Sequence, residues 1–346
     1  MPQITVLLNN YNYGRFLAEA VRSVIEQDFD DLELLIVDDG STDDSRQIIS
    51  SFNDPRIRSI FKENGGQLSA FNTGVLESTG EVISFLDADD VFMPGYLKRV
   101  WEEFEKNKDC GFLMTRLEFF GNKTGFASAW PEGKIGSNPF SVAARHLWIG
   151  MGTSACSVRR DVLLKFLPWC DGEYQWKTRA DDLLVWGGDL AGAVKYSIHE
   201  PHVKYRIHGS NLFYGEKTPA ETEVQERRDA AERFCGAVVE KNKLSYADML
   251  KTELKHGSVS RGETLRSWLK LGYRRKMRFF EYLKCGMLIL AGIKFRSSIK
   301  RIMHDPQENM SMAVEKRSKK GVLNIGCGIK LYFLLLNYFR FLCGIN

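Results

Sequence analysis

The chain has 346 residues, of which 44% are hydrophobic and 27% are charged. This is ordinary globular usage, and the length suits one large domain with a smaller one. The net charge of +4 is unevenly spread: residues 1–269 carry 32 basic and 40 acidic residues, whereas the segment from Lys270 onward carries 16 basic and 4 acidic residues. An acidic body with a basic tail indicates that the tail meets an anionic partner.

The cysteines and the N-terminus exclude further classes. The seven cysteines form no CxxC pair and show no metal-ligand spacing with histidine, so we expect buried free thiols in a reducing compartment. The first residues, MPQITVLLNN, enter a strand at once, without a basic stretch followed by an apolar signal region. Secretion is therefore not expected.

Strands and helices alternate from residue 3 to residue 107. Short apolar runs with the length of buried strands are each followed by a segment whose apolar residues recur at helical spacing. The alternation predicts right-handed βαβ units and an α/β fold with a mostly parallel sheet, covered by helices on both faces. The expected strands are 3–10, 32–39, 57–63 and 81–87, and the expected helices are 14–27, 41–52, 67–78 and 93–107, the second capped by Ser41 or Thr42 and the last with Pro94 near its start.

The four expected strands share polar carboxyl ends, at residues 9–12, 38–40, 63–66 and 87–90. Ligands of parallel α/β sheets bind beyond these ends, so we expect the four ends to converge on one cleft. The last end contains three carboxylates, those of Asp87, Asp89 and Asp90, which would repel one another unless something positive compensates them.

The acidic strand ends predict a metal. An oxygen-only ligand set, without cysteine or clustered histidine, suits Mg²⁺ or Mn²⁺, and these ions commonly bridge a protein carboxylate and substrate phosphates. We therefore expect the carboxylates to hold a metal and the metal to hold a diphosphate. Taken singly, DDGSTDD is also typical of a strand-to-helix turn and NGGQ of a Gly-rich turn, so the hypothesis depends on their joint occurrence.

The order of VLLNNYNYGRFLAEAVRSVIEQ, IVDDGSTDDS, NGGQLSAFNTGV and TGEVISFLDADD resembles the family 2 glycosyltransferases of the GT-A fold. Three later segments are similar to that family's acceptor-side segment with an Arg pair, its Glu-Asp motif and its Tyr-Arg-x-His-Gly-x-Asn segment: GMGTSACSVRR (150–160), RADDLLVWGG (179–188) and VKYRIHGSN (203–211). The resemblance implies a GT-A domain over 1–211, with a nucleotide-sugar part to about residue 107 and an acceptor part from 108. A helical, basic region would follow over 212–346.

The resemblance also implies a donor site. In the family, the first strand end and the Asp-Asp-Gly turn bind the base, and a carboxylate suits the imide N–H of uracil or a ring N–H of guanine. The residues so implied are Asn9, Tyr11 and Asp39 for the base, Asn64 and Gly65 near the nucleotide, Asp87 for the ribose, Asp89 for the metal, His208 near the metal or diphosphate, and Arg206 for the diphosphate. Without the resemblance, His208 reads as a structural loop histidine and Arg206 as part of a packed strand end.

The resemblance places the general base in ADDLLVW. Family members have Glu-Asp there, with the second residue as the base, and aligning Trp186 with the family's aromatic puts Asp182 in the base position and Asp181 in the Glu position. Because Asp replaces Glu, Asp181 stays the alternative base. A helix start with favourable acids is the plainer interpretation, and it does not exclude catalysis. One base without a covalent intermediate implies inversion.

The tail predicts surface helices. Residues 219–256 have helical composition, Lys270 to Arg301 surrounds FFEYLKCGMLILAGI with basic residues, and the C-terminus LNIGCGIKLYFLLLNYFRFLCGIN is apolar and aromatic. Neither apolar block is an uncharged run of about 20 residues, so we expect helices lying on an anionic membrane surface at its cytoplasmic face. A helical subdomain packed on itself or on a second subunit is the alternative. Nucleic acid is not expected, because the aromatics do not interleave with the charges.

The expected function is transfer of a sugar from a nucleotide sugar, with UDP-sugar first, to a hydroxyl of a glycan or lipid-linked acceptor in cell-surface glycan or polysaccharide synthesis. A sugar nucleotidyltransferase would share the sheet and the carboxylates, but it needs a Gly-rich phosphate loop with a basic residue after the first strand, which NNYNYGRF lacks. A non-catalytic nucleotide-sugar-binding or membrane assembly protein stays open, although the intact DAD, ADD and YRIHGSN argue against it.

Overall fold

The computed structural model describes residues 2–209, 211, 221–273 and 279–292. The described residues belong to one compact unit, Met1–Gly292. The predicted domain boundary after residue 211 adjoins 212–220, which lie outside the described residues, and it stays a prediction.

The alternation predicted for the first hundred residues is confirmed. Four parallel strands lie in the order β3-β2-β1-β4, with Leu7 of β1 level with Leu35 of β2 and Phe85 of β4. Apolar residues fill β1, β2 and β4 because helices bury both faces. The elements are β1 (Ile4–Asn10), α1 (Gly14–Ile25), β2 (Leu32–Asp38), α2 (Ser45–Ser51), β3 (Ile57–Phe61), α3 (Gln67–Glu77), β4 (Val82–Asp87) and α4 (Tyr96–Lys106).

The predicted cap of α2 is wrong. The helix begins at Ser45, and neither Ser41 nor Thr42 caps it. The Ser41 hydroxyl instead accepts hydrogen bonds from the Asn12 backbone N–H (2.9 Å) and the Asn10 side chain (3.1 Å). Ser41 therefore ties the end of β1 to the turn after β2, and its hydroxyl is not available to the helix.

The sheet continues beyond β4 with later strands. β9 runs antiparallel to both β4 and β6, and β10 runs parallel to β6, so the carboxyl end of β10 lies at the same edge of the sheet as that of β4. This places segments about 120 residues apart in sequence at one edge. The further strands are β5 (Val91–Phe92), β6 (Cys110–Gly121), β7 (Gly125–Phe126), β8 (Gly133–Gly136), β9 (Cys156–Arg159) and β10 (Val194–Ile207).

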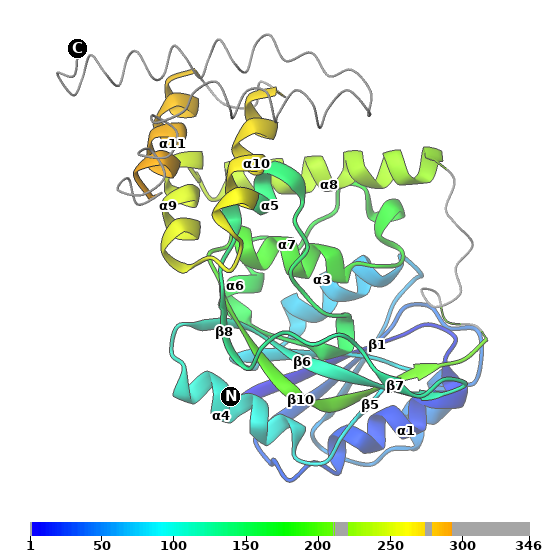
Figure 1. Ribbon diagram of the computed structural model, residues 1–346. Helices are drawn as coiled ribbons and strands as arrows, with labels where there is room; N and C mark the ends of the chain where they lie inside the picture. Colours follow the sequence, from blue (N-terminus) through cyan, green and yellow to red (C-terminus); the bar gives the residue numbers. More distant parts are fainter. Residues whose placement is uncertain (1, 210, 212–220, 274–278, 293–346) are drawn as a thin grey trace, which may run out of the picture. The chain divides into compact units, whose positions relative to one another are not determined.

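Helices cover both faces of the sheet, as predicted. Figure 1 shows α1 and α4 on one face and α3 and α7 on the other. The short helices between β8 and β10 lie on the same face of the sheet as α3. They are α5 (Pro139–Arg145), α6 (Arg160–Leu163) and α7 (Asp181–Leu190), with 3₁₀ turns at Thr153–Ala155 and Glu173–Trp176.

Of the four C-terminal helices, α8 packs on α7 and α5, α9 and α10 pack on α5, and α11 packs on α9 and α10. Buried Glu253 of α9 accepts hydrogen bonds from the backbone and hydroxyl of Ser141 in α5 and from Thr264 in α10. Trp268 of α10 stacks on Tyr282 of α11 with ring centroids 4.4 Å apart. The predicted helical character of 219–256 is thus confirmed. The helices are α8 (Glu221–Lys241), α9 (Tyr246–His256), α10 (Arg261–Tyr273) and α11 (Phe279–Gly292).

Two sequence expectations concern membrane-spanning helices and the state of the cysteines. In the part of the chain that the structure describes, no helix combines the length and apolar character needed to cross a bilayer. The apolar C-terminal block 323–346 lies outside the described residues. Of five described cysteines, none forms a disulfide and four are buried, whereas Cys170 is exposed, contrary to the expectation of buried thiols.

Candidate active site

The carboxyl ends of β1, β2 and β4 meet through hydrogen bonds between their side chains. The Asn9 amide donates to Asp87 Oδ1 at 2.9 Å, and the Asn10 amide donates to Asp38 Oδ2 at 2.8 Å. The expected convergence of these strand ends is therefore what the structure shows. Asn9 Oδ1 and Asn10 Oδ1 are buried and have no hydrogen-bond partner among the described residues, which leaves two acceptors unsatisfied at this edge.

Asp39 holds the loop that follows β3. Its buried carboxylate accepts hydrogen bonds from Lys62 Nζ (2.7 Å), the Asn64 amide (3.1 Å) and the backbone N–H groups of Gly65 (3.0 Å) and Gly66 (2.6 Å). Two of the predicted nucleotide residues, Asn64 and Gly65, are thus bound to a third. The structure shows Asp39 as the organiser of this loop, so its predicted contact with a base would share these oxygens.

The carboxylates after β4 are held differently from one another. Asp90 is fully buried and accepts from the Ser154 hydroxyl (2.6 Å) and the Arg206 backbone N–H (2.9 Å). Asp87 Oδ1 accepts from the amides of Asn9 and Gln67. Hydrogen-bond donors thus stabilise two of the three carboxylates for which the sequence predicts mutual repulsion.

Burial and mutual repulsion shift two of these carboxyl groups toward the neutral form. Burial, with the Asp89 charge adding to it, raises the pKa of Asp87 to about 6. The same two causes raise the pKa of Asp90 well above its usual range. A cation at this strand end would favour the charged forms.

His208 and Asp89 form a pair at the ends of β10 and β4. His208 Nε2 lies 3.0 Å from Asp89 Oδ2, and its Nδ1 lies 3.4 Å from an Arg15 nitrogen. The imidazole packs against Phe16 and Tyr13, with ring centroids 4.8 Å and 5.7 Å away. These contacts orient the ring toward the carboxylate, so the two residues predicted near the metal do lie together.

Arg206 supports this pair. Its Nε donates to the backbone carbonyl of Asp89 at 2.8 Å, and its guanidinium forms an ion pair with Glu19. The same guanidinium lies over the rings of Phe16 and Phe120, 4.6 Å and 4.2 Å from their centroids. The diphosphate contact proposed for Arg206 stays a prediction, since in this structure the side chain holds the protein itself.

The Asp89–His208 pair fits a divalent cation. A carboxylate oxygen and an imidazole nitrogen at one point, with no cysteine beside them, suit Mg²⁺ or Mn²⁺ with water and substrate oxygens in the other positions. Burial and the Asp89 charge raise the pKa values of the neighbouring carboxyl groups of Asp87 and Asp90, a repulsion that a bound cation would offset. Among the described residues no group of three or more His, Cys, Asp or Glu is arranged to hold a metal, so the protein itself would supply two ligands.

The predicted base motif lies at the first turn of α7, and its two aspartates face different partners. Asp182 is buried, forms an ion pair with Arg179 at 3.4 Å and accepts a hydrogen bond from the Trp148 indole. Asp181 interacts electrostatically with Asp87 of β4. The motif therefore lies near enough to the acidic strand end for the charges of Asp181 and Asp87 to act on each other.

The pKa values of both aspartates are raised above the ordinary range of a carboxyl group. Burial, followed by the charges of Asp182 and Asp87, raises the pKa of Asp181 to about 7. Burial also raises the pKa of Asp182, although Arg179 and Arg227 oppose that shift. A carboxylate with a raised pKa is the better proton acceptor at neutral pH.

Three residues of this edge were missed from the sequence. Gln67 contacts Asp87, Ser154 contacts Asp90 and Trp148 contacts Asp182. Gln67 stands in the NGGQ stretch, so that motif carried a usable signal. Ser154 stands in the GMGTSACSVRR segment, within the 3₁₀ turn Thr153–Ala155, but that motif did not indicate its contact with Asp90. Trp148 lies in a loop without local pattern.

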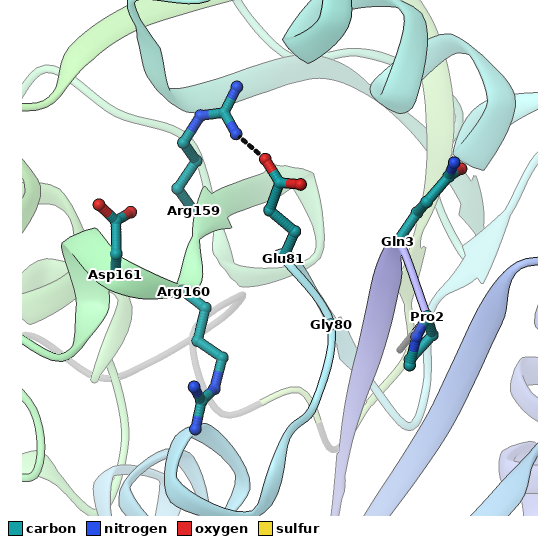
Figure 2. Close-up of a pocket in the computed structure, with 7 residues that line it drawn as sticks. All are labelled: Pro2, Gln3, Gly80, Glu81, Arg159, Arg160 and Asp161. Atoms are coloured by element: carbon teal, nitrogen blue, oxygen red, sulfur yellow. Dashed lines mark hydrogen bonds and ion pairs between the residues drawn. The ribbon is translucent and has the colours of Figure 1, made fainter.

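A hollow of about 470 Å³ lies at the opposite edge of the sheet. Figure 2 shows its lining, with Arg159 paired to Glu81 and Arg160 nearby. Arg159 is level with Val82 at the start of β4, about 17 Å along the strand from Asp87 at 3.3 Å per residue. The Arg pair of the presumed acceptor segment is thus remote from the strand ends. The lining residues are Pro2, Gln3, Gly80, Glu81, Arg159, Arg160 and Asp161.

Sequence comparisons find a family and relatives that this chain resembles. Residues 5–167 match the family described as Glycosyl transferase family 2. An uncharacterized glycosyltransferase of Nostoc sp. is 38% identical over 216 residues, which cover 60% of this chain and 66% of that protein. Chondroitin synthase of Escherichia coli is 33% identical over 136 residues, covering 38% of this chain and 20% of that protein.

Solved structures agree on the fold. The crystal structure of Staphylococcus aureus TarS 1–349 in complex with UDP-GlcNAc superimposes with a TM-score of 0.56 at 16% identity, covering 82% of this chain and 81% of that one. The curated relatives are matched over less than two thirds of their own length.

Proposed function

Because the chain belongs to glycosyltransferase family 2 and has the GT-A fold, we propose that it transfers a sugar from a nucleoside diphosphate sugar to a hydroxyl group with inversion. The observation that carries the proposal is the meeting of three distant segments at one sheet edge. The end of β4 supplies Asp87 and Asp89, the end of β10 supplies His208, and α7 supplies the aspartate pair.

We propose a UDP-sugar as the donor. TarS, which shares the fold, has been crystallised with UDP and with UDP-GlcNAc. This chain offers three features that suit a base. Asn9 supplies an unsatisfied hydrogen-bond acceptor and the exposed ring of Tyr11 a stacking surface, and the loop that Asp39 organises supplies backbone polar groups. Asp87 would reach the ribose from the next strand, and Arg206 the diphosphate.

Asp182 is proposed as the general base. Its carboxylate takes the proton of the acceptor hydroxyl while that oxygen forms its bond to the anomeric carbon and the bond to the diphosphate oxygen breaks. Trp148 and Arg179 orient the carboxylate, and its raised pKa favours proton uptake. A positioned base contributes about 10²–10⁴-fold to such a step.

Asp89 and His208 would hold the divalent metal proposed here. When bound, Mg²⁺ or Mn²⁺ supplies charge neutralisation for the departing diphosphate. Other residues of the chain hold these two ligands in place. Arg206 binds the backbone carbonyl of Asp89, and Phe16 and Tyr13 pack against the imidazole of His208.

We further propose that the acceptor is a glycan or a lipid-linked sugar in polysaccharide synthesis. Support comes from the chondroitin synthase relative. The basic C-terminal sequence supports peripheral contact with the cytoplasmic face of a membrane, because clustered Lys and Arg beside apolar residues bind anionic headgroups.

A screen of nucleotide sugars for metal-dependent binding and hydrolysis tests the proposal. We expect one UDP-sugar to bind with Mn²⁺ and to be hydrolysed slowly, and Asp89→Ala to remove the metal dependence while the fold survives. The matched control is Asp161→Ala, an exposed carboxylate at the far edge of the sheet, which should change nothing. Equal donor affinity of Asp89→Ala and parent, with and without Mn²⁺, would refute the metal assignment; no binding of any nucleotide sugar would refute the function.

A further inference from the structure

Two loops from different parts of the chain are locked together beside the proposed site. The loop 64–66 precedes α3, and the segment 177–180 precedes α7. The backbone N–H of Gln67 donates to the carbonyl of Lys177 at 3.0 Å. A Cβ atom on Gly66, which has φ +87°, would lie 2.6 Å from Lys177 Cα, so the two backbones touch without room for a side chain.

The Gln67 side chain joins these loops to the end of β4. Its Nε2 lies 3.2 Å from Asp87 Oδ1 and 3.2 Å from the Thr153 hydroxyl oxygen, and its Oε1 accepts from the Ala180 backbone N–H at 2.9 Å. Ala180 directly precedes the two aspartates of α7. One amide therefore spans the donor-side carboxylate and the start of the helix that carries the base.

We infer that Gln67 is a positioning residue that sets the base segment at a fixed distance from the donor-side carboxylate. The inference rests on the proposed function of this edge. Transfer requires the base to meet the acceptor hydroxyl while the donor is held across from it, and a misplacement of about 1 Å costs about 10²-fold. A neutral primary amide suits the position, because it donates to a carboxylate and accepts from a backbone N–H at once.

The same helix offers a matched control. Asn72 of α3 is buried, whereas Gln67 is half-buried, and the Asn72 amide donates to the Trp169 carbonyl at 2.7 Å and accepts from the Trp169 N–H at 2.9 Å. Both bonds tie α3 to the loop that contains Trp169, a residue with no role proposed for it at the site. Replacing Asn72 tests what a lost amide bridge does to stability alone.

The experiment compares Gln67→Leu with Asn72→Leu in the full chain. For Gln67→Leu we expect kcat for donor turnover to fall by about 10- to 100-fold, while the donor Kd changes less than about threefold. Asn72→Leu should lower Tm at least as much and leave kcat within about threefold of the parent, measured where both are folded. Added to Asp182→Asn, Gln67→Leu should cause little further loss, because no base remains to be positioned.

Amide hydrogen exchange supplies a readout that does not need activity. Exchange at 180–183 should rise in Gln67→Leu and stay at the parent level in Asn72→Leu, since only Gln67 holds the Ala180 N–H. The inference is overturned if Gln67→Leu keeps both the parent kcat and the parent exchange, or if its loss adds fully to that of Asp182→Asn. An inactive parent would count against the proposed function, and unchanged exchange would count against the role of Gln67.

Discussion

Individual aspartates at the sheet edge differ because of what each one touches. Asp90 is buried against Ser154 and the Arg206 backbone, Asp87 is bound by two amides, and Asp89 faces His208. Identical side chains within four residues thus stand in three environments. The sequence shows that the charges must be compensated, and the contacts decide how.

The aspartate pair of α7 allows the base to be assigned. Asp182→Asn keeps the size of the side chain and removes the proton acceptor, so transfer should fall by about 10²-fold or more. Donor binding should persist, because Asp39, Asp87 and Asp89 lie on other strand ends. Steady-state kinetics with donor titration measures both. A severe loss in Asp181→Asn with a mild one in Asp182→Asn would instead make Asp181, whose pKa the charge of Asp87 raises, the base.

Asp181 also predicts a pH dependence of stability. Its folded-state pKa of about 7 lies above the ordinary aspartate value of 3.8, so the folded protein binds the extra proton and loses stability as pH rises from about 4 to about 7. Asp181→Asn removes this loss. Because the side chain is partly exposed, we expect the variant to gain on the order of 1–2 kcal/mol at pH 8 relative to pH 4.

Unfolding in urea at several pH values, with chelator present, measures that difference. The gain should grow through the window between the two pKa values and stay constant above it. A gain that does not depend on pH would show that Asp181 does not bind the proton.

At the level of elements, a buried ion pair joins β10 to α7. Lys195 Nζ bonds Asp189 Oδ2 (2.6 Å) and the carbonyls of Ile149 (2.8 Å) and Val185 (3.0 Å), and both charged side chains are fully buried. Asp189 also accepts from the Asn138 N–H at the start of α5. The pair therefore fixes the helix that carries the base against the strand that leads to His208.

Lys195→Met should cost about 3–5 kcal/mol of unfolding free energy, because it leaves a buried carboxylate and two carbonyls without their donor. Lys134→Met is the control: its ion pair with Asp109 is exposed on both sides and should contribute less than about 1 kcal/mol. Chemical denaturation compares the two variants. Equal losses would mean that burial of the Lys195 pair has no energetic consequence.

At the scale of the whole molecule, the compact unit ends at Gly292, well beyond the family match. Glu253 and Trp268 join α9, α10 and α11 to the body of this unit, so a cut near Lys255 would expose a buried network. A chain ending at Gly292 should keep its folded core. Residues 293–346, which this truncated chain lacks, contain ten Lys or Arg and three Asp or Glu.

This truncated chain should bind anionic vesicles about tenfold or more weakly than the full chain, since each Lys or Arg near such a surface contributes ~1 kcal/mol. Co-sedimentation with vesicles of anionic and of neutral lipid measures the effect, and thermal unfolding confirms the fold. Equal binding of both chains to the anionic vesicles would place the contact elsewhere.

The amino-acid sequence by itself determined the alternation of strands and helices over residues 3–107 and the polar character of the strand ends there. Periodicity and local turn residues carry that information, so β1 to β4 and α1, α3 and α4 lie within three residues of the predicted bounds. The cap of α2 failed because the Ser41 hydroxyl binds β1, a partner that is distant in sequence.

Only the tertiary structure decided how the edge is assembled. The antiparallel insertion of β9 between β4 and β6 sets the direction of β10 and so delivers His208 to Asp89. Tertiary packing also brings three further residues to the edge, Gln67, Trp148 and Ser154. Each contacts an aspartate that is more than 19 residues away in the chain, and no local pattern encodes such a pairing. Burial then shifts the carboxyl groups of Asp87 and Asp181 toward neutral pH, because desolvation depends on the packed environment and not on neighbours in sequence.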